Sequence, residues 1–132
     1  MNLPDLPSSW SNEHSLAIIL LIVTAVDGQI DTVELGEVER RLDALNPERS
    51  VASVHLAQDA YEYLLKVSQL VEDDAELVKV VRVHAERVNS FISRDRKFQA
   101  LNAILAISEV DEDIDPTEIE VYKAAADIWH IG

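Results

Sequence analysis

Two short acidic segments are the part of this sequence whose residue types and spacing could support chemistry. The denser one spans residues 109–120 and holds seven carboxylates with no base among them: Glu109, Asp111, Glu112, Asp113, Asp115, Glu118 and Glu120. Carboxylates this close raise one another's pKa, and a hard cation such as Ca²⁺ or Mg²⁺ would relieve their repulsion while taking oxygen ligands. The segment therefore indicates a cation site or an acidic surface.

The second acidic segment repeats the first at a fixed offset of 84 residues, the separation of Asp27 from Asp111. Six residues pair at this offset and form the candidate metal set: Asp27, Asp31 and Glu34 with Asp111, Asp115 and Glu118. The spacing of Asp111, Asp113 and Asp115 resembles the start of an EF-hand loop. Pro116 and Tyr122 occupy the positions where that loop needs Gly and Glu, so any site is irregular or is built from both segments.

The same residues have two interpretations other than a cation site: helix capping and a surface that binds a partner. Asp31 with Glu34, and Asp115 with Glu118, have the spacing of helix capping boxes, in which each side chain bonds an unpaired amide at the helix start. Asp27 and Asp111 would then bond nearby amides in turns. Alternatively, the carboxylates form a patch that binds a protein partner.

Other groups that could do chemistry favour structural roles. His84 lies on an apolar helical stripe with no second His three or four residues away, which favours a hydrogen-bonded core histidine over a metal ligand. His55 has only Asp59 four residues on, which is typical of a helical ion pair. No nucleophile beside a base and no phosphate-binding Gly loop can be located in the sequence. We expect no catalytic residues and no enzymatic activity.

The composition of the chain limits the classes of molecule that it is expected to bind. The chain has 132 residues and a formal charge of −14, which disfavours binding to nucleic acid or anionic membrane surfaces. Cysteine is absent and the first residues lack the basic region of an export signal, so a cytoplasmic protein is expected. The apolar run from Leu16 to Val23 is too short to span a membrane.

Apolar residues recur every three or four positions, and capping residues precede each run, which predicts six helices. They begin near residues 10, 31, 50 and 72–74, at Ser93 or Asp95, and at Asp115. The first and fifth are apolar almost all round, so both are expected at the centre. On the third helix we expect a buried stripe, from which Tyr63 is absent and therefore exposed: Val54, Ala57, Tyr61, Leu64, Ser68 and Val71.

The 84-residue offset extends into the following helices, where Leu35, Val38, Leu42 and Leu45 match Ile119, Tyr122, Ala126 and Trp129. Each copy is an apolar helix, an Asp-led loop and an amphipathic helix. We expect a single domain over residues 1–132, with an approximate two-fold duplication: copy one at about 10–45, connecting helices at about 50–92 and copy two at about 95–131.

The segment from Ala25 to Glu34 resembles the A-x-D-G-x-I-x-x-x-E motif of TerB-like (tellurite-resistance) domains. The second copy departs from it, because Glu112 stands where the family usually repeats Gly. The resemblance implies an all-α TerB-like helical bundle that acts as a binding or scaffold module. Such modules occur in stress-response operons and in membrane-associated co-chaperones, so a protein partner in a membrane-associated complex is implied.

If the acidic loops bind a divalent cation, thermal unfolding will depend on it. A cation at about 100 times its Kd stabilises the folded state by roughly 2.7 kcal/mol, which raises Tm by several degrees. We expect a saturable rise with Ca²⁺ relative to EDTA that is lost in the Asp27→Asn, Asp111→Asn double variant. A shift no larger than that of a monovalent salt control would leave the loops as caps or a partner surface.

Overall fold

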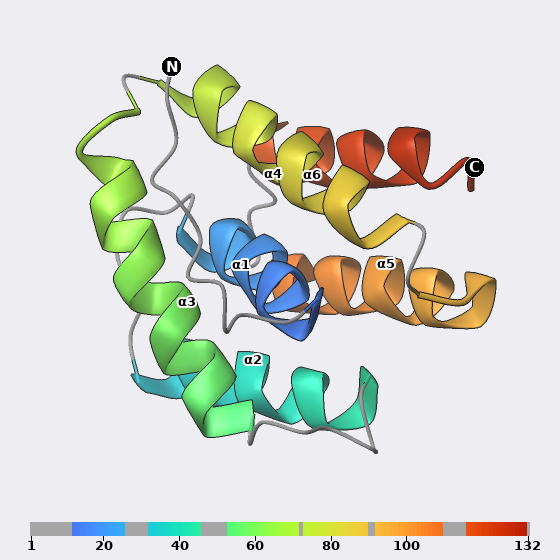
Figure 1. Cartoon of the computed structure of the whole chain (residues 1–132), viewed down its shortest axis with the longest axis horizontal. Helices are drawn as coiled ribbons and strands as arrows, with labels where there is room; N and C mark the ends of the chain where they lie inside the picture. The colour runs from blue at the N-terminus through green and yellow to red at the C-terminus, as the bar shows by residue number, and fades with distance from the viewer. Residues whose placement is uncertain are drawn as a thin grey trace.

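The computed structural model describes residues 12–25, 32–45, 53–71, 73–89, 92–109 and 116–131 (Figure 1). These residues form six α-helices and no β-strand, which confirms the predicted all-α helical bundle. The helices are α1 (Asn12–Ala25), α2 (Thr32–Leu45), α3 (Ser53–Ser68), α4 (Asp74–Asn89), α5 (Arg94–Glu109) and α6 (Pro116–Ile128).

Helix α1 is the centre of the bundle, as its all-round apolar sequence predicts. Every residue from His14 to Val23 is buried. Helices α2, α3, α4 and α5 all pack against α1, and Figure 1 shows it enclosed among them. Because each large apolar side chain contributes about 1.5–3 kcal/mol when removed from water, this one helix organises the core.

Local capping signals correctly located the starts of α4 and α5, whereas α3 begins at Ser53, three residues after its predicted cap Ser50. The Asp73 carboxylate accepts a hydrogen bond from the Glu76 amide at 3.0 Å, which caps α4. The Ser93 hydroxyl oxygen accepts one from the Arg96 amide at 3.2 Å. Ser93 is therefore the N-cap of α5, and of the two predicted starts it is the one used.

Helix α5 is less central than its sequence suggests. It packs against α1, α2 and α6, and its buried side is formed by Ala100, Leu101, Ala103 and Ile104. Leu105 is 41% exposed, and Asn102 is also exposed. The expectation of a second central helix is wrong because neighbouring helices cover α5 on one side, leaving a face of mixed character in water.

The buried face of α3 differs from the predicted stripe. Ser68 is exposed, whereas Tyr63 is only 5% exposed and packs edge-on to the His84 ring of α4, with the ring centroids 5.5 Å apart. The expectation of an exposed Tyr63 is wrong because α3 packs against α1 and α2 and its Tyr63 ring also reaches His84 of α4. The buried face is therefore wider than predicted, and adds the following residues to the predicted Ala57 and Leu64: Leu56, Ala60, Tyr63 and Val67.

Helix α6 also turns a different face inward from the one that the duplication predicts. Its buried residues include Val121, Ala124 and Ala125. Of the predicted positions, Trp129 just beyond the helix is buried as expected, whereas Tyr122 and Ala126 are half-buried and Ile119 is 44% exposed. In α2 the predicted positions Val38 and Leu42 are buried. The buried face of α6 is therefore displaced by one residue, or about 100° around the helix axis.

The end of α6 is fixed by side-chain and backbone bonds. The Trp129 indole N–H donates to the Ala85 carbonyl of α4 at 3.0 Å. The Ile131 amide donates to the Ala126 carbonyl at 2.9 Å and the His130 amide to the Asp127 carbonyl at 3.2 Å, which is the Schellman pattern. His130 has φ of 55° and so occupies the left-handed position where Gly is preferred.

Replacing His130 with Gly should therefore stabilise the protein. Removing the Cβ from a left-handed residue relieves about 1 kcal/mol, equivalent to a rise in Tm of about 3–5 °C in a domain of this size. Thermal unfolding by circular dichroism measures it. His130→Ala is the matched control, since it removes the imidazole and keeps the Cβ; equal effects of the Gly and Ala variants would contradict the strain argument.

Candidate functional site

The structure gives partial information on the six candidate metal ligands. Asp27, Asp31, Asp111 and Asp115 lie outside the described residues. Glu34 lies in the first turn of α2, where the backbone but not the side chain is described. The proposed cation site therefore stays a prediction, and the described residues bring no three His, Asp or Glu side chains together as a metal-binding group.

Glu118 is the one candidate ligand whose side chain is described. It lies in the first turn of α6, and only 3% of it is exposed. This burial follows from the turned face of α6, which places position 118 with Val121 and Ala125 on the side that faces the core. A carboxylate so enclosed adds nothing to an exposed acidic surface.

The helices that carry Glu34 and Glu118 have a common orientation. In Figure 1 the colour gradient runs from left to right along both α2 and α6, so both helices begin on the same side of the bundle. Helix α5 runs in the opposite direction and packs against both of them. The first turns of α2 and α6 thus face the same side of the molecule.

A buried polar cluster joins α1, α3 and α4. The Ser15 hydroxyl of α1 lies 3.1 Å from Nδ1 of His84 on α4, and both residues are 1% exposed. This contact confirms the interpretation of His84 as a hydrogen-bonded core histidine. Beside it, Nε2 of His14 lies 3.0 Å from Oδ2 of Asp59 on α3. Two adjacent polar residues of α1 therefore bond to two different helices.

The Ser15–His84 pair has the composition of a nucleophile and its base, but its surroundings do not suit that chemistry. A catalytic pair must reach a substrate atom at about 3 Å, whereas both side chains are enclosed by the core and the Tyr63 ring covers the imidazole. The pair connects two helices instead.

Burial shifts the pKa values of His84 and of the neighbouring Tyr63. Desolvation, with a smaller contribution from the positive charge of Arg87, lowers the pKa of His84 from 6.5 to about 4, so the ring is neutral near pH 7. Desolvation likewise raises the pKa of Tyr63. Among the described residues Nε2 of His84 has no hydrogen-bond partner, so a proton added to this ring would be poorly accommodated.

The hydrogen-bond partners of His14 and His84 were not predicted from the sequence. Asp59 was considered as a partner of His55, its neighbour one turn away, yet its carboxylate contacts His14, 45 residues distant. One feature of the sequence could have indicated that His14 and Ser15 are buried and need polar partners. Both residues directly precede the apolar run of α1, which is buried on every side.

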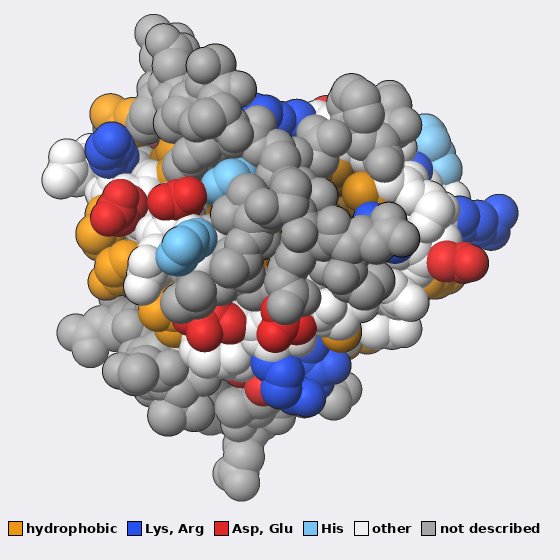
Figure 2. Space-filling view, turned by 60° about the horizontal axis from the view of Figure 1, so that its bottom comes forward, with side chains coloured by type: hydrophobic (Ala, Val, Ile, Leu, Met, Phe, Trp, Pro, Cys, Tyr) orange, Lys and Arg blue, Asp and Glu red, His pale blue; other side chains and the backbone are white. Residues whose placement is uncertain are grey.

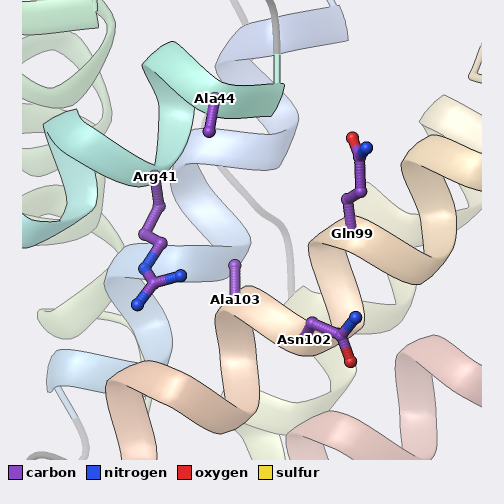
Figure 3. Close-up of a pocket in the computed structure, with 5 residues that line it drawn as sticks. All are labelled: Arg41, Ala44, Gln99, Asn102 and Ala103. Carbon is purple, nitrogen blue, oxygen red and sulfur yellow. The ribbon is translucent and has the colours of Figure 1, made fainter.

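The described surface contains a groove between α2 and α5, shown in Figure 3. Its volume is about 240 Å³, and the described residues that line it are Arg41, Ala44, Gln99, Asn102 and Ala103. Ala44 of α2 and Ala103 of α5 point toward each other, and the Arg41 side chain reaches from α2 toward α5. No residue pattern in the sequence predicts this groove, because it depends on how two helices distant in the sequence pack.

A wider hollow of about 410 Å³ lies at the end of α6, lined by Tyr122, Lys123, Ala126, Asp127, His130 and Ile131. All of these residues belong to one helix and its C-terminal cap, and Asp127 lies 3.4 Å from Arg82 of α4. The hollow is an open surface beside the cap and not an enclosed site.

No protein family, curated protein or solved structure matches this chain in comparisons with known proteins. Within the described ranges, no helix has both the length and the apolar character needed to cross a bilayer. Function is therefore inferred from the residues of this chain.

The buried His84 should make stability fall with acidification. The folded-state pKa of about 4 lies below the unfolded value of 6.5, so only the unfolded chain takes up this proton between those values. Stability from this source is complete above pH 6.5 and is lost as pH falls, by about 2 kcal/mol between pH 7 and pH 5.

Urea unfolding at several pH values tests this effect. In the His84→Leu, Ser15→Ala double variant, the decrease in the free energy of unfolding between pH 7 and pH 5 should be smaller by about 2 kcal/mol. The full decrease should persist in His55→Leu, which removes an exposed histidine of α3. If the free energy of unfolding of the double variant decreases as much as that of the unchanged protein, other groups cause the pH dependence.

Proposed function

We propose that the chain is a non-catalytic, TerB-like interaction module of the cytoplasm that docks a protein partner through an acidic surface made by its two Asp-led segments. The resemblance of residues 25–34 to the TerB-like motif associates it with stress response or tellurite resistance, in a complex that can be membrane-associated. The partner surface is basic, because the net charge of −14 attracts cationic surfaces and repels nucleic acid.

The observation that carries the proposal is the common orientation of α2 and α6. Each helix follows one of the acidic segments, and both begin on the same side of the bundle (Figure 1). This arrangement supports presentation of both segments to one partner, with carboxylates from residues 27–31 and 111–115.

The remaining acidic residues give less support for a docking surface. On the face shown in Figure 2, described Asp and Glu side chains lie in small groups beside Lys and Arg. Exposed pairs of this kind contribute about 0–1 kcal/mol and cancel each other's field at a distance. The unbalanced charge of residues 109–115 is therefore the stronger attractant for a basic partner.

Divalent-cation binding is the alternative function of the same segments. The carboxylate density of residues 109–115 favours it, and a cation held there would order the surface that the partner contacts. Calcium-dependent stability would support this alternative, and docking without any cation would separate the two functions.

Matched charge variants test the docking proposal. The protein is immobilised and exposed to an extract of its own organism, and the bound proteins are quantified by mass spectrometry. We expect a partner whose capture falls at least tenfold in the Asp27→Asn, Asp111→Asn variant and also between about 0.15 and 0.5 M salt, since exposed charges are screened over roughly 8 Å at the lower value.

The control variant is Glu62→Gln with Glu86→Gln, which removes the same charge from exposed positions on α3 and α4. Partner capture should survive in this variant. An equal loss in both variants would mean that net charge alone attracts the bound proteins, and salt-resistant capture would contradict an acidic docking surface.

A further inference from the structure

Helix α6 carries an apolar stripe that the bundle leaves largely uncovered. Ile119, Tyr122 and Ala126 are spaced by three and four residues, so they lie along one face of the helix. Ile119 is 44% exposed, and the other two residues are half-buried. The main contacts of α6 are with α4 and α5, and Figure 1 shows it at the edge of the bundle, away from α2 and α3. The outer face of α6 is therefore open to another molecule.

The hollow of about 410 Å³ lies on this face, because Tyr122 and Ala126 line it. The small Ala126 has larger neighbours about one turn away on both sides: Tyr122 and Lys123 before it and His130 after it. A small residue among larger ones forms a hole into which the side chains of a second helix pack. The hollow therefore suits a helix that crosses α6 at Ala126.

His130 provides an independent observation at this hollow. Its side chain lines the rim, and its φ of 55° places it in the left-handed position where Gly is preferred. A side chain at such a position costs about 1 kcal/mol, and backbone strain of this kind is concentrated at functional sites. A contact of the imidazole with a bound molecule would offset that cost.

The exposed charges along α6 are complementary to their own reversed order. Acidic and basic residues alternate, and all four are exposed: Glu120, Lys123, Asp127 and His130. The first three lie within about 60° of one another around the helix axis. Positions 123 and 127 are equally far from residue 125, and so are positions 120 and 130. In an antiparallel pair of α6 helices centred there, Lys123 faces Asp127 of the second copy and Glu120 faces His130, so each carboxylate meets a donor.

The charge at this face permits contact between two copies, although the whole chain carries −14. Glu120 and Asp127 are balanced by Lys123 and by Arg82 of α4, whose guanidinium lies 3.4 Å from the Asp127 carboxylate. The side chains of Arg82 and Asp127 are 48% and 75% exposed, so this pair is weak and leaves Asp127 able to bind a second base.

The acidic segments that precede α6 also lie far apart in such a pair. With the helices antiparallel and centred at residue 125, their first turns are separated by roughly 27 Å along the axis. This exceeds the roughly 8 Å over which exposed charges act at physiological salt. The unbalanced acids of the two copies are therefore largely screened from each other.

We propose that the outer face of α6 docks a second copy of this chain, in an antiparallel pair that crosses at Ala126. Each hollow receives the α6 helix of the other copy, which covers Tyr122 and Ala126. The pair between Lys123 and Asp127 forms twice. Because both copies use the same surface, the pair closes as a two-fold dimer. The contact involves mainly one helix from each copy, so the dimer is weak and forms as concentration rises.

The alternating charges favour this occupant over others. In a parallel pair of α6 helices, Lys123 would face Lys123 and Asp127 would face Asp127. A uniformly acidic helix of another protein would place a carboxylate against Asp127, and a uniformly basic helix would place a base against Lys123. An antiparallel second copy avoids both clashes.

Charge reversal tests the pairing directly. Sedimentation velocity of the full chain at about 0.15 M salt, over a roughly hundredfold range of concentration, should show a monomer–dimer equilibrium. Lys123→Glu and Asp127→Lys should each weaken dimerisation at least fivefold, because each replaces two attractive pairs with two repulsive ones. An equimolar mixture of the two variants should dimerise again, since every pair in the mixed dimer joins opposite charges.

Matched controls carry the same charge changes on α3. Lys66→Glu and Glu62→Lys alter exposed positions away from α6 and should leave dimerisation within about twofold of that of the unchanged protein. Circular dichroism verifies that each variant is folded, as expected for substitutions at exposed positions.

His130→Gly separates backbone strain from the contact. It should weaken the dimer at least threefold because the imidazole no longer reaches Glu120 of the second copy, while it raises the Tm measured at concentrations where the monomer predominates. His130→Ala should weaken the dimer equally without that rise in Tm.

Three outcomes would overturn the proposal. One is a monomer over the whole range of concentration. Another is a dimer that the control variants weaken as much as the α6 variants do, since net charge alone would then control assembly. The last is a mixture of Lys123→Glu and Asp127→Lys that stays as dissociated as either variant alone, since the helices would then not pair in the antiparallel register.

Discussion

The arrangement of the whole bundle depends on the burial of α1. Ten consecutive residues of this helix, from His14 to Val23, are out of water, and an isolated helix of this length would be unstable. The protein stabilises it by packing α2, α3, α4 and α5 around it, so the order of the helices in space follows from what is needed to cover α1. The polar and charged residues of the covering helices then occupy the outside, where the net charge of −14 accumulates.

Sequence patterns predicted the fold class and the helix boundaries because these depend on local chemistry. The carboxylate of Asp73 and the hydroxyl of Ser93 cap helices by bonding amides three residues ahead, so their positions alone mark the helix starts. Which face of each helix is buried was predicted less well. Tyr63 is buried against the expectation of exposure, and Ile119 is exposed against the expectation of burial, because the buried face depends on neighbouring helices distant in the sequence.

In the candidate site, too, features set by local sequence were predicted, and contacts set by packing between distant helices were not. His84 was correctly predicted as a hydrogen-bonded core histidine from its place on an apolar stripe, whereas its partner Ser15 lies 69 residues earlier and only the packed bundle brings the two together. Glu118 has the residue type and spacing of a ligand or cap, yet its burial depends on the rotation of α6. The four Asp candidates lie outside the described residues, and their role stays a prediction from charge density.

The polar bonds of α1 also determine its register within the bundle. From Leu16 onward this helix presents apolar side chains in every direction, so its apolar surface distinguishes weakly between one rotation and the next. His14 and Ser15 remove that ambiguity because they bond Asp59 of α3 and His84 of α4. A slip of one residue would turn α1 by about 100° and break both bonds inside the core. Two neighbouring polar residues thus select a single alignment for a helix that hydrophobic packing alone would hold in several.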